Sequence, residues 1–145
     1  MRTILVAGMM MAAGAAAAVD FGVELSIAQD ALFASSRPPL RVVECNTLRC
    51  IYQTHSKDIT LSLGFNDEKT VVTFYVFYRP SNWAIAADYI EQIQAALRVP
   101  RAEIVNVREL AEAGKDRRSG SANSKTVACR TDGDGLTPTI VCTRA

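Results

Sequence analysis

Four cysteines are the residues of this sequence whose type and spacing point most directly to chemistry. They are Cys45, Cys50, Cys129 and Cys142. Four cysteines allow three disulfide pairings, and we predict Cys45–Cys50 with Cys129–Cys142, because each pair brackets a turn and can bridge facing strands of a hairpin. Structural zinc sites usually have close C-x2-C pairs and thioredoxin-type redox sites need C-x-x-C, so zinc and redox chemistry are the weaker interpretations.

His55 is the only histidine, so any Ser-His-Asp or Cys-His site would have to use it. Ser56 and Asp58 are close in sequence, but the members of a catalytic triad normally come from separate segments. With all four cysteines oxidised, no thiolate nucleophile remains. We interpret His55 as a solvated turn residue, and keep a small enzyme that uses carboxylates and His55 as an alternative.

Asp132 and Asp134, in the segment Asp-Gly-Asp-Gly, are the acids closest in pattern to a metal-binding loop. A calcium-binding EF-hand needs further ligand positions and a glutamate at position twelve, and this chain has only a fragment of that pattern. A hairpin turn with two glycines explains the segment better. Among 15 Asp and Glu residues, no pair stands out for glycoside cleavage. We predict no metal site, no cofactor and no catalytic residue.

The first eighteen residues have the pattern of a secretory signal. A short positive start, Met1-Arg2-Thr3, precedes an uncharged apolar run that ends in small residues, and Ala16 and Ala18 fit cleavage after Ala18. The alternative, an uncleaved membrane anchor, needs roughly 20 apolar residues, and the apolar run here is shorter and ends in small residues. We therefore predict a signal peptide over 1–18, a single domain over 19–145, and a periplasmic or extracellular location with no transmembrane span after cleavage.

The charge balance of the mature chain argues against a nucleic-acid partner. The sequence has 16 Lys and Arg against 15 Asp and Glu, and cleavage would remove Arg2 and leave equal numbers. Nucleic-acid-binding proteins usually carry a basic patch, so a protein is the expected partner.

Hydrophobic spacing predicts helices over 23–34 and about 83–98. Residues 101–114 combine a short strand pattern with a helical turn or two, and 114–125 is predicted as a polar loop. The β-forming segments are 40–54 (two strands around the small disulfide loop), 58–65, 70–78, 126–130 and 139–143.

These elements predict an α+β domain. An antiparallel sheet of about five or six strands is packed by the long helix at about 83–98 and by an N-terminal helix on its other face or its edge. With a turn at 66–69, Phe65 would face Thr70. That register gives one apolar face, made by Ile59, Leu61, Leu63, Val72, Phe74 and Val76. The opposite face is mixed, and carries Thr60, Ser62, Val71, Thr73, Tyr75 and Phe77.

Three groups of residues are candidates for partner contact. Tyr75 and Phe77 either lie in the core under the N-terminal helix or form an exposed aromatic patch. Lys115, Arg117 and Arg118 are basic residues on the polar loop, which is either simply solvated or contacts an acidic partner or anionic glycan. The third group is the disulfide-bounded loop of Asn46, Thr47, Leu48 and Arg49.

The loop from Cys45 to Cys50 is similar in form to the C-x4-C loop of bacterial periplasmic lysozyme inhibitors. The resemblance covers these six residues and the flanking strands, and it implies an inhibitor that inserts a rigid loop into a secreted hydrolase. Those inhibitors place a histidine in the loop, whereas this loop has none.

The absence of a recognisable site favours a non-catalytic binding or accessory protein of the cell envelope. An inhibitor that uses the Cys45–Cys50 loop and a small enzyme are the alternatives. The three hypotheses predict different surfaces. The binding protein needs an uncovered aromatic sheet face, the inhibitor an exposed convex tip at 46–49, and the enzyme a concave pocket that joins His55 to two acids.

Overall fold

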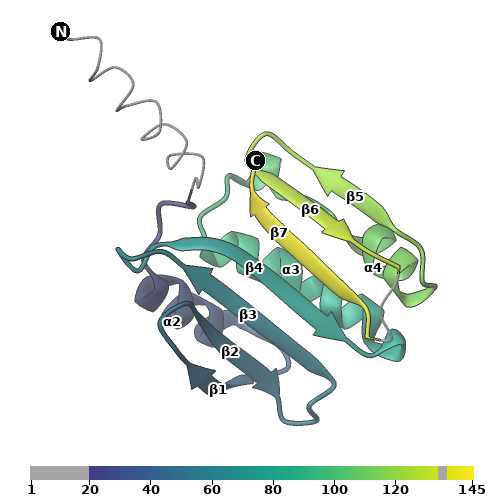
Figure 1. The fold of residues 1–145 in the computed structure, drawn as a ribbon, viewed down its shortest axis with the longest axis horizontal. Coiled ribbons are helices and arrows are strands. Elements are labelled where there is room, and N and C mark those ends of the chain that lie inside the picture. The colour runs from purple at the N-terminus through teal and green to yellow at the C-terminus, as the bar shows by residue number, and fades with distance from the viewer. Residues whose placement is uncertain (1–19, 134–136) are drawn as a thin grey trace, which may run out of the picture.

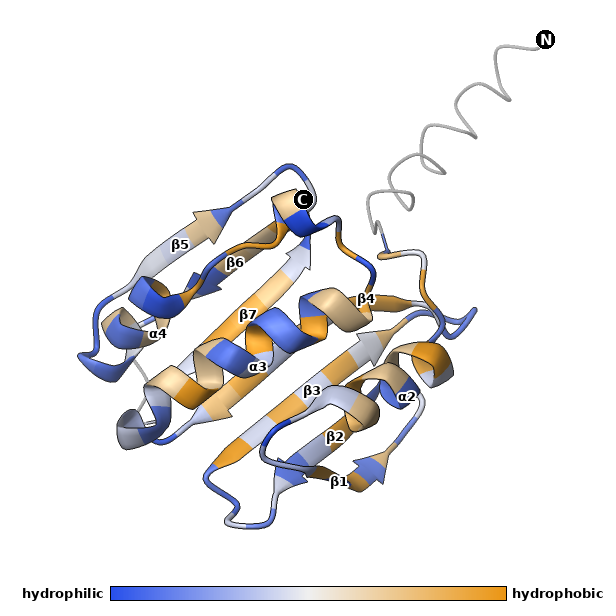
Figure 2. Ribbon diagram, turned by 180° about the vertical axis from the view of Figure 1, so that it is seen from behind, coloured by the Kyte–Doolittle hydropathy of each residue, from blue (hydrophilic) through white to orange (hydrophobic). Residues whose placement is uncertain are grey.

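The computed structural model describes residues 20–133 and 137–145, and these residues form an α+β structure of two layers. One seven-stranded antiparallel sheet has the strand order β1-β2-β3-β4-β7-β6-β5, and three α-helices lie on one of its faces (Figures 1 and 2). The helices are α2 (Leu25–Ser35), α3 (Trp83–Ala96) and α4 (Arg108–Lys115). The strands are β1 (Leu40–Cys45), β2 (Arg49–Thr54), β3 (Ile59–Phe65), β4 (Val71–Tyr78), β5 (Gly120–Asn123), β6 (Val127–Thr131) and β7 (Thr139–Arg144).

The predicted fold class is confirmed, with one strand more than expected. The additional strand is β5, which lies inside 114–125, the segment predicted as a loop. The predicted signal peptide at 1–18 and the residue Asp134 lie outside the described residues. In the described part of the chain, no helix is both long enough and apolar enough to cross a membrane.

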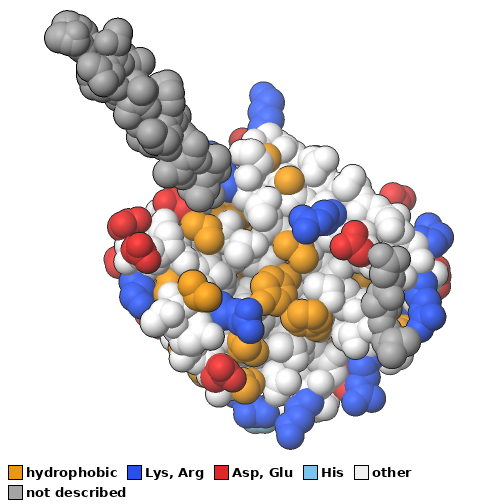
Figure 3. Space-filling model, in the orientation of Figure 1, with side chains coloured by type: hydrophobic (Ala, Val, Ile, Leu, Met, Phe, Trp, Pro, Cys, Tyr) orange, Lys and Arg blue, Asp and Glu red, His pale blue; other side chains and the backbone are white. Residues whose placement is uncertain are grey.

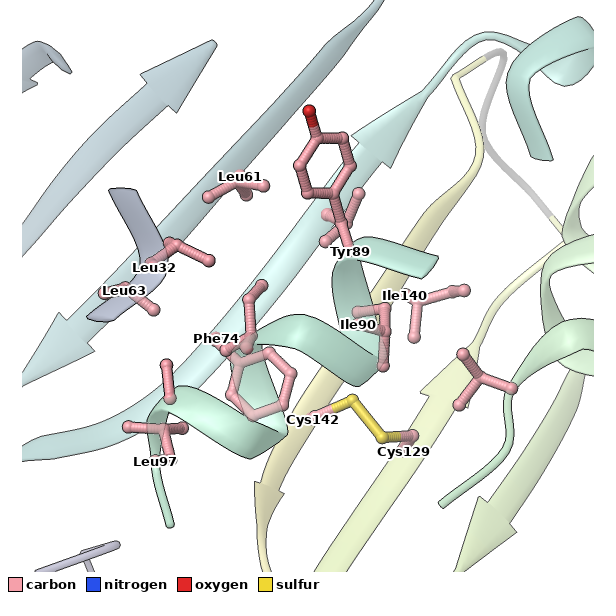
Figure 4. Close-up of a cluster of buried hydrophobic side chains, with 14 of the residues drawn as sticks. Leu32, Leu61, Leu63, Phe74, Tyr89, Ile90, Leu97, Cys129, Ile140 and Cys142 are labelled. Atoms are coloured by element: carbon pink, nitrogen blue, oxygen red, sulfur yellow. A yellow bond between two sulfur atoms is a disulfide. The ribbon is translucent and has the colours of Figure 1, made fainter. Parts of the chain in front are cut away.

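Both predicted disulfides are present and each joins directly facing residues of neighbouring strands. Cys45 pairs with Cys50 across β1 and β2, and Cys129 pairs with Cys142 across β6 and β7. The second bond is fully buried among apolar side chains (Figure 4). Each disulfide therefore closes a local hairpin, as the spacing of the cysteines predicts.

The register between β3 and β4 differs from the predicted one by two residues. Leu61 faces Val76, and Leu63 faces Phe74. One residue of the shift comes from the turn, where Asn66 pairs with Thr70 and Lys69 adopts a positive φ of 63°. The other comes from a bulge in β4 near Val72.

An even shift keeps each side chain on its predicted face, except near the bulge. Val71, expected on the mixed face, is fully buried, whereas Val72, expected on the apolar face, is only half-buried. The β3 side chains Ile59, Leu61 and Leu63 are buried, as the alternation of the sequence predicts.

Helix α3 covers the middle of the sheet. Its residues Ala86, Tyr89, Ile90 and Ile93 are buried, and Figure 4 shows Ile90 pointing toward the sheet beside Ile140 and the inner disulfide. The helix ends at Ala96, two residues before the predicted end at 98. Arg98, just beyond it, adopts a positive φ of 60°.

Helix α2 packs over the β1–β2 edge of the sheet, on the same face as α3. The N-terminal helix was expected on the other face or at the edge, and it lies at the edge. Its residues Ala28 and Leu32 are buried, and the Phe33 ring meets the Tyr52 ring edge to face, with the ring centroids 5.6 Å apart. No described helix covers the opposite face of the sheet, which we call the open face.

Gln94 is a polar residue of helix α3 that is buried inside the structure. Its side chain is 0 % exposed, and it acts as a clamp for the chain that returns after α3. Its amide nitrogen donates to the carbonyl of Val105 (3.0 Å) and, more weakly, to that of Ile90 (3.3 Å). Its amide oxygen accepts from the backbone N–H of Val105 at 2.8 Å.

Three buried tyrosines hold their phenolic protons strongly. Desolvation by burial raises the pKa of Tyr78 and of Tyr89 to about 12, and it raises the pKa of Tyr52 well above its ordinary value. Each phenol also donates a hydrogen bond that the ionised form would lose. The acceptors are Gln29 Oε1 for Tyr52 (2.7 Å), the Ala111 carbonyl for Tyr78 (2.8 Å) and the Pro38 carbonyl for Tyr89.

We expect the free energy of unfolding to fall as pH rises from about 10 to about 12. Below this range, the folded and unfolded chains both keep the phenolic protons. Within it, the unfolded chain ionises while the folded chain does not, which lowers stability by about 1.4 kcal/mol per pH unit for each such tyrosine. Urea unfolding followed at several pH values measures this slope, and a flat profile across the range would contradict it.

Candidate functional site

The open face is the first functional candidate, and its composition follows from strand alternation. A central row crosses it from β1 to β5 and mixes apolar, aromatic, charged and small polar side chains. In strand order the row reads Glu44, Ile51, Ser62, Tyr75, Val141, Arg130 and Ser121. A neighbouring row contains Arg41, Gln53, Thr60, Phe77 and Thr139.

Two aromatic rings occupy the centre of the open face. Tyr75 and Phe77 project from β4, and their rings meet edge to face, with centroids 5.2 Å apart and planes at 88°. Phe77 is 37 % exposed and Tyr75 is half-buried. Of the two positions considered for this pair, under a helix or on an uncovered face, the structure shows the second.

Ser62 shows that the side chains of this face lie close over the sheet. It is only 1 % exposed although no described helix covers it, and its cross-strand neighbours on this face are Ile51 and Tyr75. Its hydroxyl has no hydrogen-bond partner among the described residues. Neighbouring side chains on this face therefore cover the Ser62 hydroxyl.

Two arginines flank this aromatic centre. Arg49 lies on β2 and Arg130 on β6, each two strands from β4, which corresponds to about 10 Å at the usual strand spacing. Figure 3 shows apolar side chains gathered near the middle of this face with basic groups beside them. A small hollow of about 180 Å³ adjoins Arg130 and is also lined by Ser121, Asn123, Ala128, Cys129 and Thr143.

Arg130 and Val141 were not among the residues selected from the sequence. Their strands were predicted as the closing hairpin, and the alternation of Thr139, Val141 and Thr143 marks one face of β7. What the sequence did not show is that β7 lies beside β4, which brings this hairpin next to the aromatic pair.

The disulfide-bounded tip at 46–48 is a second exposed feature. The side-chain oxygen of Asn46 accepts from the backbone N–H groups of Leu48 (2.8 Å) and Arg49 (2.9 Å). Leu48 is 69 % exposed and its carbonyl accepts from Phe65 N–H. Of the predicted loop residues, Asn46, Thr47 and Leu48 thus form a preorganised, exposed tip at the end of the β1–β2 hairpin, whereas Arg49 is the first residue of β2.

The basic residues at 115–118 are largely compensated by neighbouring acids. Lys115 lies 3.5 Å from Asp116 and 4.0 Å from Glu112, and Arg118 lies 3.5 Å from Asp116. The Lys115 ammonium also stacks over the Trp83 ring, with the nitrogen 5.5 Å from the ring centroid. Arg117 is exposed and has a positive φ of 61°. The structure brings Lys115, Arg117 and Arg118 together near α4, but not next to the aromatic centre.

His55 is exposed in the turn between β2 and β3, as predicted. Its sequence neighbour Asp58 pairs with Arg79 at 3.0 Å. Within residues 20–133 and 137–145, no group of three or more His, Cys, Asp or Glu side chains could hold a metal ion. Asp132 is exposed.

Comparison with known proteins gave no relative. No family model, no curated protein and no solved structure matches this chain.

Proposed function

We propose that this chain is an exported, non-catalytic binding or accessory protein of the cell envelope, and that its open face receives a protein partner. The observation that carries the proposal is the pair Tyr75 and Phe77, which lies on a sheet face that no described helix covers. An aromatic pair at the centre of an interface supplies large contact area at low conformational cost.

The chemistry of the face indicates the character of the partner. Ile51, Val141 and the two rings offer an apolar centre, and Arg49 and Arg130 place a guanidinium on either side of it. A protein surface with an apolar patch between carboxylates would match both features. The near-neutral charge of the whole chain gives no basic footprint for nucleic acid.

Export is part of the proposal, and two features support it. The first eighteen residues have the composition of a secretory signal. Two disulfides and no free cysteine among the described residues fit an oxidising compartment, either the periplasm or the extracellular medium.

The exposed tip supports a second candidate, an inhibitor of a secreted hydrolase. Asn46 and the Cys45–Cys50 bond fix the tip before binding, which reduces the entropy cost of inserting Leu48 into an active site. The two candidates use different surfaces, because the tip lies at the end of the β1–β2 hairpin and the rings lie on β4.

A capture experiment with three baits separates these candidates. The baits are the oxidised mature protein, a face variant (Tyr75→Thr with Phe77→Thr, which keeps β-forming residues) and a tip variant (Thr47→Ala with Leu48→Ala, two exposed residues outside the strands). We expect one envelope protein to be retained by the native protein and the tip variant, and to bind the face variant at least about 30-fold more weakly, which corresponds to about 2 kcal/mol.

Two outcomes would contradict the proposed face. A hydrolase retained by the native protein and the face variant but lost by the tip variant would establish the inhibitor. If all three baits capture the same protein equally, neither surface is the binding site. Thermal unfolding of each bait is the control for folding, and Arg130→Glu should weaken the native complex if the partner is acidic around its apolar patch.

A further inference from the structure

The strand β1 is an exposed apolar edge of the sheet. Val42 and Val43 are 42 % and 43 % exposed, and β1 has a neighbour on one side only, so one row of its backbone groups is free. Of the five exposed large hydrophobic residues in the described chain, four belong to α2, β1 and the tip: Ile27, Val42, Val43 and Leu48. Apolar surface is thus concentrated at this edge.

A bulge in β1 sets which of its side chains share a face. Val42 faces Tyr52 and Glu44 faces Ile51, so Val43 is the extra residue. Because of it, Arg41 and Glu44 both lie on the open face, although three positions separate them. Leu40 and Cys45, which face Thr54 and Cys50, both lie on the helix-covered side.

We propose that β1 pairs with β1 of a second copy, antiparallel and across a two-fold axis between Val42 and Val43. In this register Arg41 faces Glu44 of the second copy, twice by symmetry, and Leu40 faces Cys45. Both members of each of these pairs lie on the same side of the sheet, as antiparallel pairing requires. Without the bulge, Arg41 and Glu44 would project to opposite sides.

Charge complementarity selects the second copy as the occupant of this edge. Neither Arg41 nor Glu44 has an ion pair among the described residues, and the hydrogen bond from Arg41 to Gln53 Oε1 is long, at 3.4 Å. Registers that place like charges opposite each other would be disfavoured. The other edge, β5, offers only Gly120, Ser121, Ala122 and Asn123.

The two-fold axis would run perpendicular to the sheet. The helices of both copies then lie on one side, and the two open faces join on the other. The dimer would present two aromatic centres in the same direction, which would give it two equivalent docking surfaces for a partner that is repeated or dimeric.

Charge reversal tests the register. We expect the oxidised mature protein to dimerise in sedimentation equilibrium, and Arg41→Glu or Glu44→Arg alone to raise the dimer Kd at least about 30-fold, because each places two like-charge pairs across the axis. The mixture of the two single variants should restore association as a heterodimer, since both of its pairs are then complementary. The double variant should dimerise as the native protein does.

Matched controls keep the result specific. Glu68→Arg reverses an exposed charge in the β3–β4 turn and should leave the Kd unchanged. The face variant, Tyr75→Thr with Phe77→Thr, should also still dimerise, so this test is independent of the proposed docking face. A native protein that stays monomeric at about 1 mM, or single variants that associate as tightly as the native chain, would overturn the proposal. If the face variant failed to dimerise while the charge-reversal variants still did, the two copies would meet through their open faces and not through β1.

Discussion

Replacing Gln94 with alanine is expected to lower the free energy of unfolding by about 3–5 kcal/mol. The substitution leaves the N–H and the C=O of Val105 without their partner in a site where Gln94 is fully buried. Each unsatisfied buried group costs about 1–3 kcal/mol, and the cavity left by the side chain adds to the loss. Urea unfolding of the oxidised protein, followed by fluorescence of the single tryptophan, Trp83, measures the change.

Gln92 is the matched control for this substitution. It lies on the same helix, it is only half-buried, and its side-chain oxygen has no hydrogen-bond partner among the described residues. Gln92→Ala should therefore change the free energy of unfolding by no more than about 0.5 kcal/mol. If the two variants lost the same free energy of unfolding, helix α3 would be sensitive to any side-chain truncation. The hydrogen bonds between Gln94 and Val105 would then make no particular contribution to stability.

Replacing Gly114 with alanine is expected to lower the free energy of unfolding by about 2–4 kcal/mol. A Cβ at this position of α4 would lie 2.4 Å from the Tyr78 hydroxyl and 3.0 Å from the Thr131 hydroxyl. Tyr78 cannot move away easily, because its ring is buried and its hydroxyl donates to the Ala111 carbonyl. Overpacking costs about 1–3 kcal/mol and the lost hydrogen bond about 1 kcal/mol more.

Tyr78→Phe provides a rescue test of this explanation. Alone, it should cost about 1 kcal/mol through the lost hydrogen bond. Combined with Gly114→Ala, it removes the atom that the new methyl group would meet, so the double variant should be more stable than Gly114→Ala alone. Additive losses in this double-mutant cycle would show that the clash with Tyr78 is not the cause.

Local sequence signals predicted most of the elements and both disulfides. The alternation from Ile59 to Phe65 was sufficient for β3, and the turns between cysteines were sufficient for the pairing. Strand β5 was missed because its residues, Gly-Ser-Ala-Asn, have no β-forming side chain, and its conformation depends on pairing with β6. The role of Gln94 was not predicted, because its partner, Val105, lies eleven residues further along the chain.

The candidate site could be predicted only in part, because it too depends on contacts between distant parts of the chain. Tyr75 and Phe77 could be assigned to one face from alternation alone, but whether a helix covers that face depends on long-range packing. The position of α2 is decided by the contacts of Gln29 and Phe33 with Tyr52, on the side of the sheet that α3 also covers. Arg130 reaches the site only because β7 inserts between β4 and β6.

The strand order also divides the sheet into two groups of strands that no disulfide joins. β1 to β4 follow one another as hairpins, β5 to β7 form a second group, and the two groups meet in the sheet only where β4 pairs with β7. Each group contains its own disulfide, and neither bond crosses between them. A single cut between Arg117 and Arg118 would therefore produce two fragments, each with a closed hairpin, that are joined only by non-covalent contacts. The fold thus has the form of a split protein, whose halves could be produced separately and reassembled by complementation.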